Sequence, residues 1–208
     1  MEERFSVIKA RWKALLEAYK ANAINPTLTY RIMNTPAVLR MVGMPNVPLE
    51  IDGGTFNHIL NHEGMELEIL SNLPQEIRRP IMVLDSYANR KIAVVELRDK
   101  NGATIIVPLD ISKRRGHTVV NLINNAYGKN PRIQTPNGTW KQRRGTDYDW
   151  FIENNIKKGR VEYLDKEKSI QWTQSGRSDS PNKGNPLDAL FAFIISEAFQ
   201  KVKTEGKL

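Results

Sequence analysis

The chain has 208 residues, of which 40% are hydrophobic and 26% are charged, a composition typical of a globular protein with one core rather than of a disordered chain. It has no cysteine, which excludes disulfides and thiolate chemistry. The net charge is +8, and residues 1–112 hold equal numbers of basic and acidic side chains, so residues 113–208 carry all of that charge.

The first segment, MEERFSVIKARWKALLEAYK, alternates charged and apolar residues and lacks the apolar core of a signal peptide. The longest apolar run, residues 189–195, is too short to span a bilayer. We therefore expect a soluble protein made in a cytoplasm. Apolar residues from Phe5 to Tyr19 recur at helical spacing, which predicts an amphipathic helix that docks on the domain or binds another chain.

Further helices are predicted before residue 80. Asn34, Thr35 and Pro36 are typical of a helix start, and Gly43 would end that short helix. A strand is expected over 47–51, a helix from Thr55 to Gly64, and another over 72–79 that Ser71 caps and Pro80 ends. His58 and His62 would lie one turn apart on the same side of the 55–64 helix.

After Pro80 the pattern becomes that of strands, rich in Val and Ile and separated by turn residues. Asn101-Gly102 is a common signal of a tight hairpin. The predicted fold class is α+β: N-terminal helices, then a four-stranded antiparallel meander with helices on one face, then additional C-terminal helices. The predicted strands are 81–85, 91–97, 103–109 and 118–123.

Residues 126–146 are polar and basic and predict no regular element, whereas 147–158 favours a helix, 161–164 a strand and 166–174 a helix. Residues 175–186 have the composition of a linker. A last helix begins at Asn185-Pro186, and its apolar residues would be buried in the domain or against a partner. We expect an N-terminal segment (1–33), a main α+β domain (34–174, with a basic insertion at 131–147) and a C-terminal segment (175–208).

Between Ile111 and Thr146 the chain has many Lys and Arg residues and no acidic residue. Such a segment suits the phosphate backbone of a nucleic acid, although a solvated basic loop has the same composition. Trp140 would stack on a base or pin its loop to the protein. The candidate nucleic-acid contacts are Lys113, Arg114, Arg115, Arg132, Trp140, Lys141, Arg143 and Arg144.

Common phosphate-binding, hydrolase and metalloprotease motifs are absent. His58 and His62 have the spacing of two zinc ligands, but no third ligand is evident, so we predict neither a metal site nor a cofactor. The groups that remain for catalysis are imidazoles and the cations of Lys and Arg. Metal-free RNA cleavage needs a base for the 2'-hydroxyl, an acid for the departing 5'-oxygen and positive charge near the phosphate, which His, Lys and Arg can supply.

Several stretches together resemble the phage MuF C-terminal domain, over roughly residues 34–172. They are TPAVLRMVGMPNVPLEI (35–51), the helix ending in His62, LPQEIRRPIMVLDS (73–86), the Asn-Gly hairpin, NAYGK (125–129) and WFIENNIKKGRVEYLDKEK (150–168). That family is similar in layout to the ribonuclease fold of barnase, EndoU, certain colicins and RelE. The resemblance therefore implies a phage or mobile-element protein, delivered with a phage genome, with a ribonuclease-like fold.

The positions that match the family pattern are His62 and the Tyr127-Gly128-Lys129 stretch, and His58 falls where relatives often have a basic residue. The resulting hypothesis is a toxin-like, metal-independent endoribonuclease with His62 as general base or acid, His58 or Tyr127 as its partner, and Lys129 on phosphate. The alternative is a non-enzymatic nucleic-acid-binding or virion-associated module that uses residues 111–146. Candidate partners are RNA or another nucleic acid, an inhibitor or immunity protein, and a second copy bound through the terminal helices; no membrane is expected.

Overall fold

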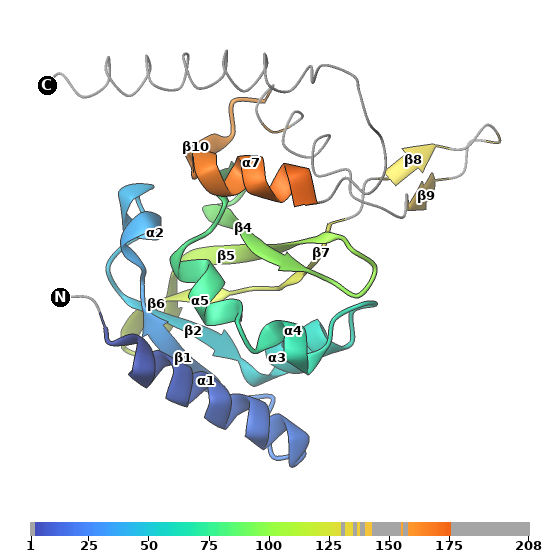
Figure 1. The fold of residues 1–208 in the computed structure, drawn as a ribbon. Coiled ribbons are helices and arrows are strands. Elements are labelled where there is room, and N and C mark those ends of the chain that lie inside the picture. The colour runs from blue at the N-terminus through green and yellow to red at the C-terminus, as the bar shows by residue number, and fades with distance from the viewer. Residues whose placement is uncertain are drawn as a thin grey trace, which may run out of the picture.

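A computed structural model of the protein describes residues 3–129, 132–134, 137, 140–142, 155 and 158–175. Its centre is an eight-stranded sheet in which strands run in the order β1-β2-β6-β5-β4-β3-β10, with β7 added by pairing to β5 (Figure 1). The strands are β1 Thr29–Asn34, β2 Pro48–Asp52, β3 Met82–Ser86, β4 Arg90–Arg98, β5 Thr104–Arg115, β6 Thr118–Ile123, β7 Tyr127–Gly128 and β10 Val161–Leu164.

The described helices are mostly short. They are α1 Phe5–Lys20, α2 Ala37–Met41, α3 Gly53–Leu60, α4 Leu67–Leu70, α5 Leu73–Arg78 and α7 Lys166–Ser175. The predicted α+β class is therefore confirmed, as are the N-terminal helix, the strand at 161–164 and the helix after it.

The predicted four-stranded meander is wrong in extent. Its strands are present as β3 to β6, each antiparallel to the next. However, β2 adds to β6 in parallel, β1 extends the sheet beyond β2, and β10 extends it beyond β3, so the sheet is larger and mixed. No sequence pattern indicated β1 or β7, because β1 buries only Ile32 and Met33 and β7 has two residues, too few to show a period.

The helices cover both faces of the sheet, not one. The larger core lies between α1–α5 and the sheet face that carries Ile105, Val107 and Leu109 of β5. On the other face, Trp172 of α7 packs on a smaller cluster that includes Met82 and Ile106. Figure 1 shows α7 on the side of the sheet opposite α1. Burial on both faces explains why the β5 sequence is a nearly continuous apolar run.

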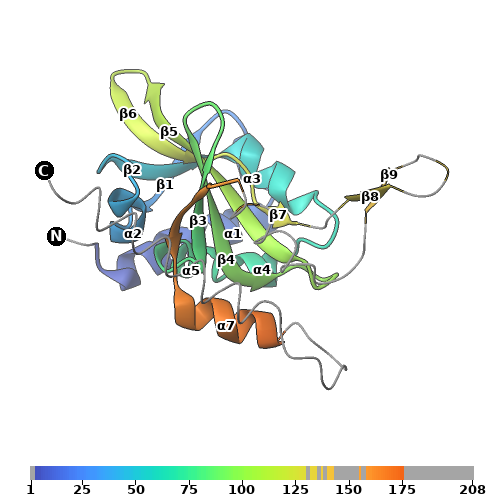
Figure 2. The same ribbon diagram turned by 90° about the horizontal axis from the view of Figure 1, so that it is seen from above.

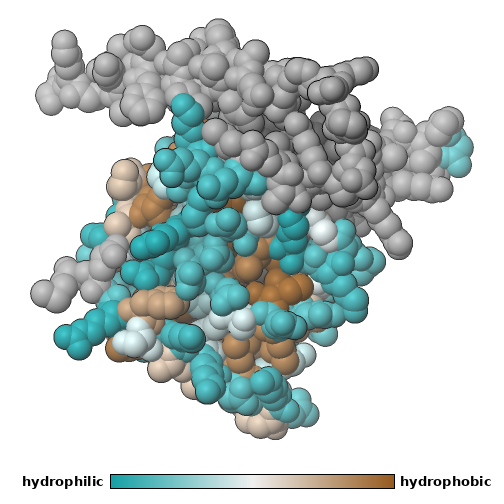
Figure 3. Space-filling model, in the orientation of Figure 1, coloured by the Kyte–Doolittle hydropathy of each residue, from teal (hydrophilic) through white to brown (hydrophobic). Residues whose placement is uncertain are grey.

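Helix α1 docks in the larger core rather than standing apart. Ile8, Trp12, Leu15 and Leu16 are buried there, and the indole Nε1 of Trp12 donates a hydrogen bond to the carbonyl of Leu70 at 2.7 Å. Within the described residues, none of the helices combines the length and apolar character needed to cross a bilayer. On the face seen in Figure 3, apolar residues form separate patches among hydrophilic ones.

Several helices begin or end at other residues than predicted. Helix α3 ends at Leu60, so His62 lies just beyond the helix, in a turn that Gly64 continues with a φ of +84°. Pro36, whose ring suits the first helical position, is instead the N-cap of α2, which begins at Ala37. Ser71 does not cap α5 but donates its Oγ hydrogen bond back to the carbonyl of Glu68 at 2.6 Å.

The β4–β5 hairpin also differs from the expected two-residue turn. Gly102 has a φ of +80°, but Asn101 does not adopt a positive φ. The turn is instead held by Asp99: its carbonyl accepts the Gly102 N–H at 2.9 Å, and its Oδ1 accepts the N–H groups of Asn101 at 2.9 Å and Ala103 at 2.8 Å.

The basic insertion holds a short antiparallel pair, β8 Arg132–Gln134 and β9 Trp140–Gln142, where no regular element was predicted. The predicted helix at 147–158, apart from Asn155 and Lys158, lies outside the described residues, as do the linker after residue 175 and the last helix. The proposed domain boundaries stay predictions.

Candidate functional site

His58, His62 and Tyr127 come together from two elements far apart in the sequence. His58 lies in the last turn of α3, His62 follows that helix, and Tyr127 begins β7 at the edge of β5. The ring centroids of His58 and His62 are 4.6 Å apart, and those of His62 and Tyr127 are 5.6 Å apart. His58 is exposed, whereas His62 and Tyr127 are half-buried, so solvent reaches the cluster from one side.

Asn125 sets the orientation of the His62 ring. The Nε2 of His62 lies 3.0 Å from Oδ1 of Asn125, and that oxygen also accepts the N–H of Ala126 at 2.8 Å. Because the Ala126 N–H can only donate, the amide orientation is fixed with its oxygen toward the ring. In the neutral ring Nε2 therefore carries the hydrogen, and Nδ1 is the nitrogen that can accept a proton.

Tyr127 is positioned by a close approach of β7 to the β4–β5 turn. Its backbone pairs with Ile106, and Gly128 pairs with Ile105. A Cβ on Gly128 would lie 2.0 Å from Oδ2 of Asp99, so only glycine allows this approach. Burial raises the pKa of the Tyr127 phenol above 10.0, so this group is a proton donor rather than a base near neutral pH.

Lys129 directly follows β7. Its backbone N–H donates to the carbonyl of Thr104 at 2.8 Å, and the residue is half-buried two positions after Tyr127. The structure thus brings His58, His62 and Tyr127 together, and Lys129 follows this cluster two positions after Tyr127. Among the described residues, no third His, Cys, Asp or Glu joins the two histidines in a group that could hold a metal ion.

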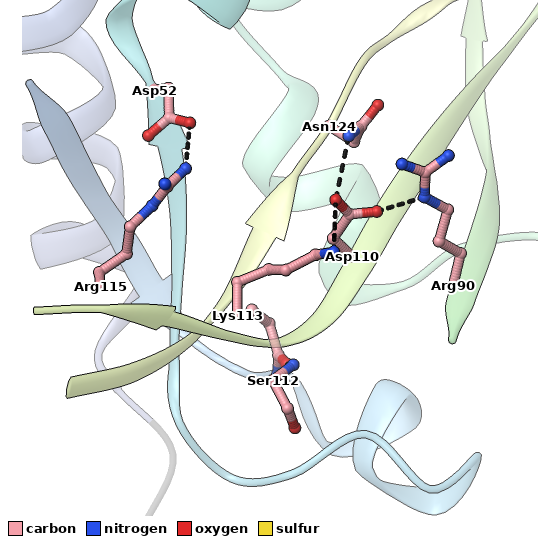
Figure 4. Close-up of polar contacts among 8 residues, drawn as sticks. Asp52, Arg90, Asp110, Ser112, Lys113, Arg115 and Asn124 are labelled. Carbon is pink, nitrogen blue, oxygen red and sulfur yellow. Dashed lines mark hydrogen bonds and ion pairs between the residues drawn. The ribbon is translucent and has the colours of Figure 1, made fainter. Parts of the chain in front are cut away.

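The predicted nucleic-acid contacts divide into two groups. Lys113, Arg114 and Arg115 end β5 in a hairpin that projects from the sheet (Figure 2). Lys113 forms an ion pair with Asp110, and Arg115 forms one with Asp52 (Figure 4). Arg114 is exposed and has no ion-pair partner among the described residues. The β5–β6 hairpin therefore carries less unpaired positive charge than its sequence indicates.

The other group lies in the insertion. Arg132, Trp140 and Lys141 belong to β8 and β9, whose side chains are not among those described, and Arg143 and Arg144 lie outside the described residues. Their role as nucleic-acid contacts stays a prediction.

Sequence reasoning missed Asn125, although it stands in the NAYGK stretch, because nothing in the pattern shows that its side chain turns to His62. It also missed Asp110 and Arg90. Asp110 is buried at 5% exposure and accepts hydrogen bonds from Arg90 and Asn124 (Figure 4). The available signal was an acidic residue in an otherwise apolar strand, just before the basic segment.

A family model described as the phage MuF C-terminal domain matches residues 57–171, which is more than half of the chain. The match contains His58, His62, Asn125, Tyr127 and Lys129. It begins after β2, so α1, β1, α2 and β2 lie outside it. No curated protein and no solved structure gives a significant match.

Proposed function

The chain belongs to the phage MuF C-terminal domain family, and we propose that it is a metal-independent endoribonuclease whose site is built from His58, His62, Tyr127 and Lys129. The observation that carries the proposal is the contact of His62 with both His58 and Tyr127, with ring centroids 4.6 and 5.6 Å away. Two imidazoles and a phenol at such separations can act on opposite sides of one phosphodiester.

His62 is the general base. Its Nδ1 takes the proton of the 2'-hydroxyl, and the 2'-oxygen then attacks the neighbouring phosphorus. Asn125 supports this role, because it accepts the hydrogen of Nε2 and stabilises the imidazolium formed when Nδ1 is protonated. An amide that fixes the tautomer of a catalytic histidine has the same role as the asparagine of papain-like proteases.

Tyr127 is the general acid. Its phenol is protonated near neutral pH, as a tyrosine ordinarily is, and burial raises its pKa further. It donates that proton to the 5'-oxygen as the P–O5' bond breaks. His58, which is exposed and contacts His62, contributes a second imidazole, and Lys129, two positions after Tyr127, supplies the cation for the charge on the phosphoryl oxygens. The products are a 2',3'-cyclic phosphate and a free 5'-hydroxyl.

The test uses labelled single-stranded RNA in EDTA, with product ends analysed on a denaturing gel. We expect the wild type to cleave RNA and leave 2',3'-cyclic phosphate ends, and His62→Ala to lower the rate at least about a hundredfold, as loss of a general base does. His117→Ala is the matched control, because His117 is an exposed histidine in the β5–β6 turn, away from the cluster. It should cleave at the wild-type rate.

Cleavage that survives in His62→Ala would remove His62 from the mechanism. Absence of cleavage by the wild type, together with salt-dependent RNA retardation on a native gel, would favour the nucleic-acid-binding module instead. In that case the same basic residues would bind RNA without chemistry.

A further inference from the structure

Asp110 of β5 organises two cations at one end of the sheet. Its Oδ1 forms a hydrogen-bonded ion pair with Nε of Arg90, and its Oδ2 lies 3.1 Å from Nδ2 of Asn124 and 3.4 Å from Nζ of Lys113 (Figure 4). Because one carboxylate faces two cations, the cluster has excess positive charge. Asp110 itself is buried, so the cations are held from inside the protein.

A β-bulge brings Lys113 to this carboxylate. In a regular strand, residues three apart point to opposite faces of the sheet. Here Asp110 pairs with Leu122 and Lys113 pairs with Val120, so two residues of β5 oppose the single residue Asn121 of β6. The extra residue turns the Lys113 side chain to the face of Asp110.

The backbone of the bulge is strained at Ser112 and is held by hydrogen bonds. Ser112 has a φ of +53°, which costs a non-glycine residue about 1 kcal/mol. Its N–H donates at 3.1 Å to Oδ1 of Asn121, a fully buried residue whose Nδ2 donates to Oγ1 of Thr35 at 2.8 Å and to the carbonyl of Pro45 at 3.0 Å. A strained residue fixed by a buried amide indicates that the position of Lys113 matters.

Both cations keep donors for a ligand. The side chains of Arg90 and Lys113 are 42% and 43% exposed. Arg90 uses Nε for Asp110, and no described residue accepts a hydrogen bond from its two terminal nitrogens. A guanidinium held along one edge presents the rest of its fork in a fixed direction, which suits the oxygens of a phosphate.

Two residues that are adjacent in the chain connect the two cations to the histidine cluster. Asn124 donates to Asp110, and the next residue, Asn125, accepts from His62. Adjacent Cα atoms are about 3.8 Å apart, so the two groups are linked through one dipeptide between β6 and β7.

We propose that Arg90 and Lys113, held by Asp110, form a phosphate-binding site that positions the RNA backbone next to His62. This assignment rests on the proposed function, since it places a neighbouring phosphate of the same substrate. It adds Arg90, which no sequence pattern indicated, and assigns Asp110 the role of a positioning residue that does not touch the ligand.

The test measures binding of a short single-stranded oligonucleotide with 2'-O-methyl groups throughout, which cannot be cleaved because its 2'-hydroxyls are blocked. The test variant is Arg90→Gln with Lys113→Gln, and the matched control is Lys9→Gln with Lys13→Gln, which removes the same charge from exposed positions on α1. We expect the test variant alone to bind at least about tenfold more weakly, with the salt slope of log K lowered by about 0.7 for the one lost phosphate.

A second variant, Arg90→Lys, keeps a cation beside Asp110 but removes the guanidinium fork, and it should bind more weakly than wild type while unfolding at the same temperature. If Arg90→Lys and a folded double variant both bind as tightly as the control, the phosphate site is refuted.

The failure of the phosphate site and the failure of the nuclease proposal give different results. Cleavage with an unchanged KM in the double variant would keep the nuclease and reject the phosphate site, whereas loss of oligonucleotide binding in a protein that never cleaves RNA would do the reverse.

Discussion

Gly128 is the residue on which the geometry of the histidine cluster depends most directly. Its missing side chain lets β7 lie against the β4–β5 turn, where the Asp99 carboxylate is buried and bonded to two backbone N–H groups. Asp99 cannot move aside without losing those bonds. The glycine therefore fixes where its neighbour Tyr127 meets His62.

We predict that Gly128→Ala destabilises the protein by about 3 kcal/mol, because the new methyl group overlaps the Asp99 carboxylate and forces it from its hydrogen bonds. Urea unfolding measures the change. Gly116→Ala is the control: a Cβ there has no atom of the described residues within 4 Å, so only its positive φ of +56° opposes alanine, at a cost of about 1 kcal/mol. Equal losses for the two variants would show that the overlap at Gly128 relaxes.

At the scale of elements, α7 is the helix that closes the second face of the sheet. Trp172 is 8% exposed, its Nε1 donates to Oγ1 of Thr104 at 3.0 Å, and the guanidinium of Arg98 lies 4.0 Å from its ring centroid. Lys168 adds an ion pair to Glu96 at 2.8 Å and a hydrogen bond to the carbonyl of Arg79 at 2.9 Å. Among the α7 side chains that the structure describes, Trp172 is the one that joins the apolar cluster on this face.

Trp172→Ala should lower the free energy of unfolding by roughly 3–5 kcal/mol, the cost of removing a buried tryptophan and leaving a cavity. Trp172→Phe keeps an aromatic ring on the cluster and loses chiefly the bond to Thr104, for a cost of roughly 1–2 kcal/mol. Chemical denaturation of both variants measures this difference. A loss below 1 kcal/mol for Trp172→Ala would mean that α7 contributes little to the fold.

At the scale of the whole molecule, a buried carboxyl couples folding to pH. Glu76 of α5 is raised in pKa above 4.5, first by burial and also by Glu96, and the attraction of Lys168 only partly opposes this. The geometry agrees, since Nζ of Lys168 is 3.8 Å from Oε2 of Glu76, too far for a hydrogen bond, and that oxygen has no hydrogen-bond partner among the described residues. The folded state therefore holds this proton more tightly than the unfolded state.

Since the folded pKa of Glu76 is the higher one, stability falls as pH rises from 4.5 through that folded pKa, and above it the full cost of the buried charge is present. We predict that Glu76→Gln matches wild type in acid and becomes more stable than wild type as pH rises toward 7. Thermal unfolding across this range measures the difference. Glu68→Gln, at an exposed glutamate of α4, reports the effect of removing one negative charge alone. A Glu76→Gln variant that is less stable at pH 7 would show that the attraction of Lys168 outweighs burial.

The sequence by itself determined the features that depend on local pattern. Helical spacing located α1 and α7, and runs of Val and Ile located β3 to β6, because buried positions leave a pattern of apolar residues in the sequence. The stretches that resemble the family, taken in their order along the chain, also indicated the family, which the match over residues 57–171 confirms. His62 and Tyr127 were selected as site residues on the same resemblance.

Only the tertiary structure decided what depends on contacts between distant segments. The parallel pairing of β2 with β6, the contact of Asn125 with His62, and the approach of Gly128 to Asp99 each join residues whose spacing in the chain carries no period. Likewise the bulge at Ser112, which turns Lys113 to Asp110, comes from hydrogen bonds of a buried Asn121. Local pattern specifies which face of an element is buried, whereas the partners of a side chain are specified by the packing of the whole chain.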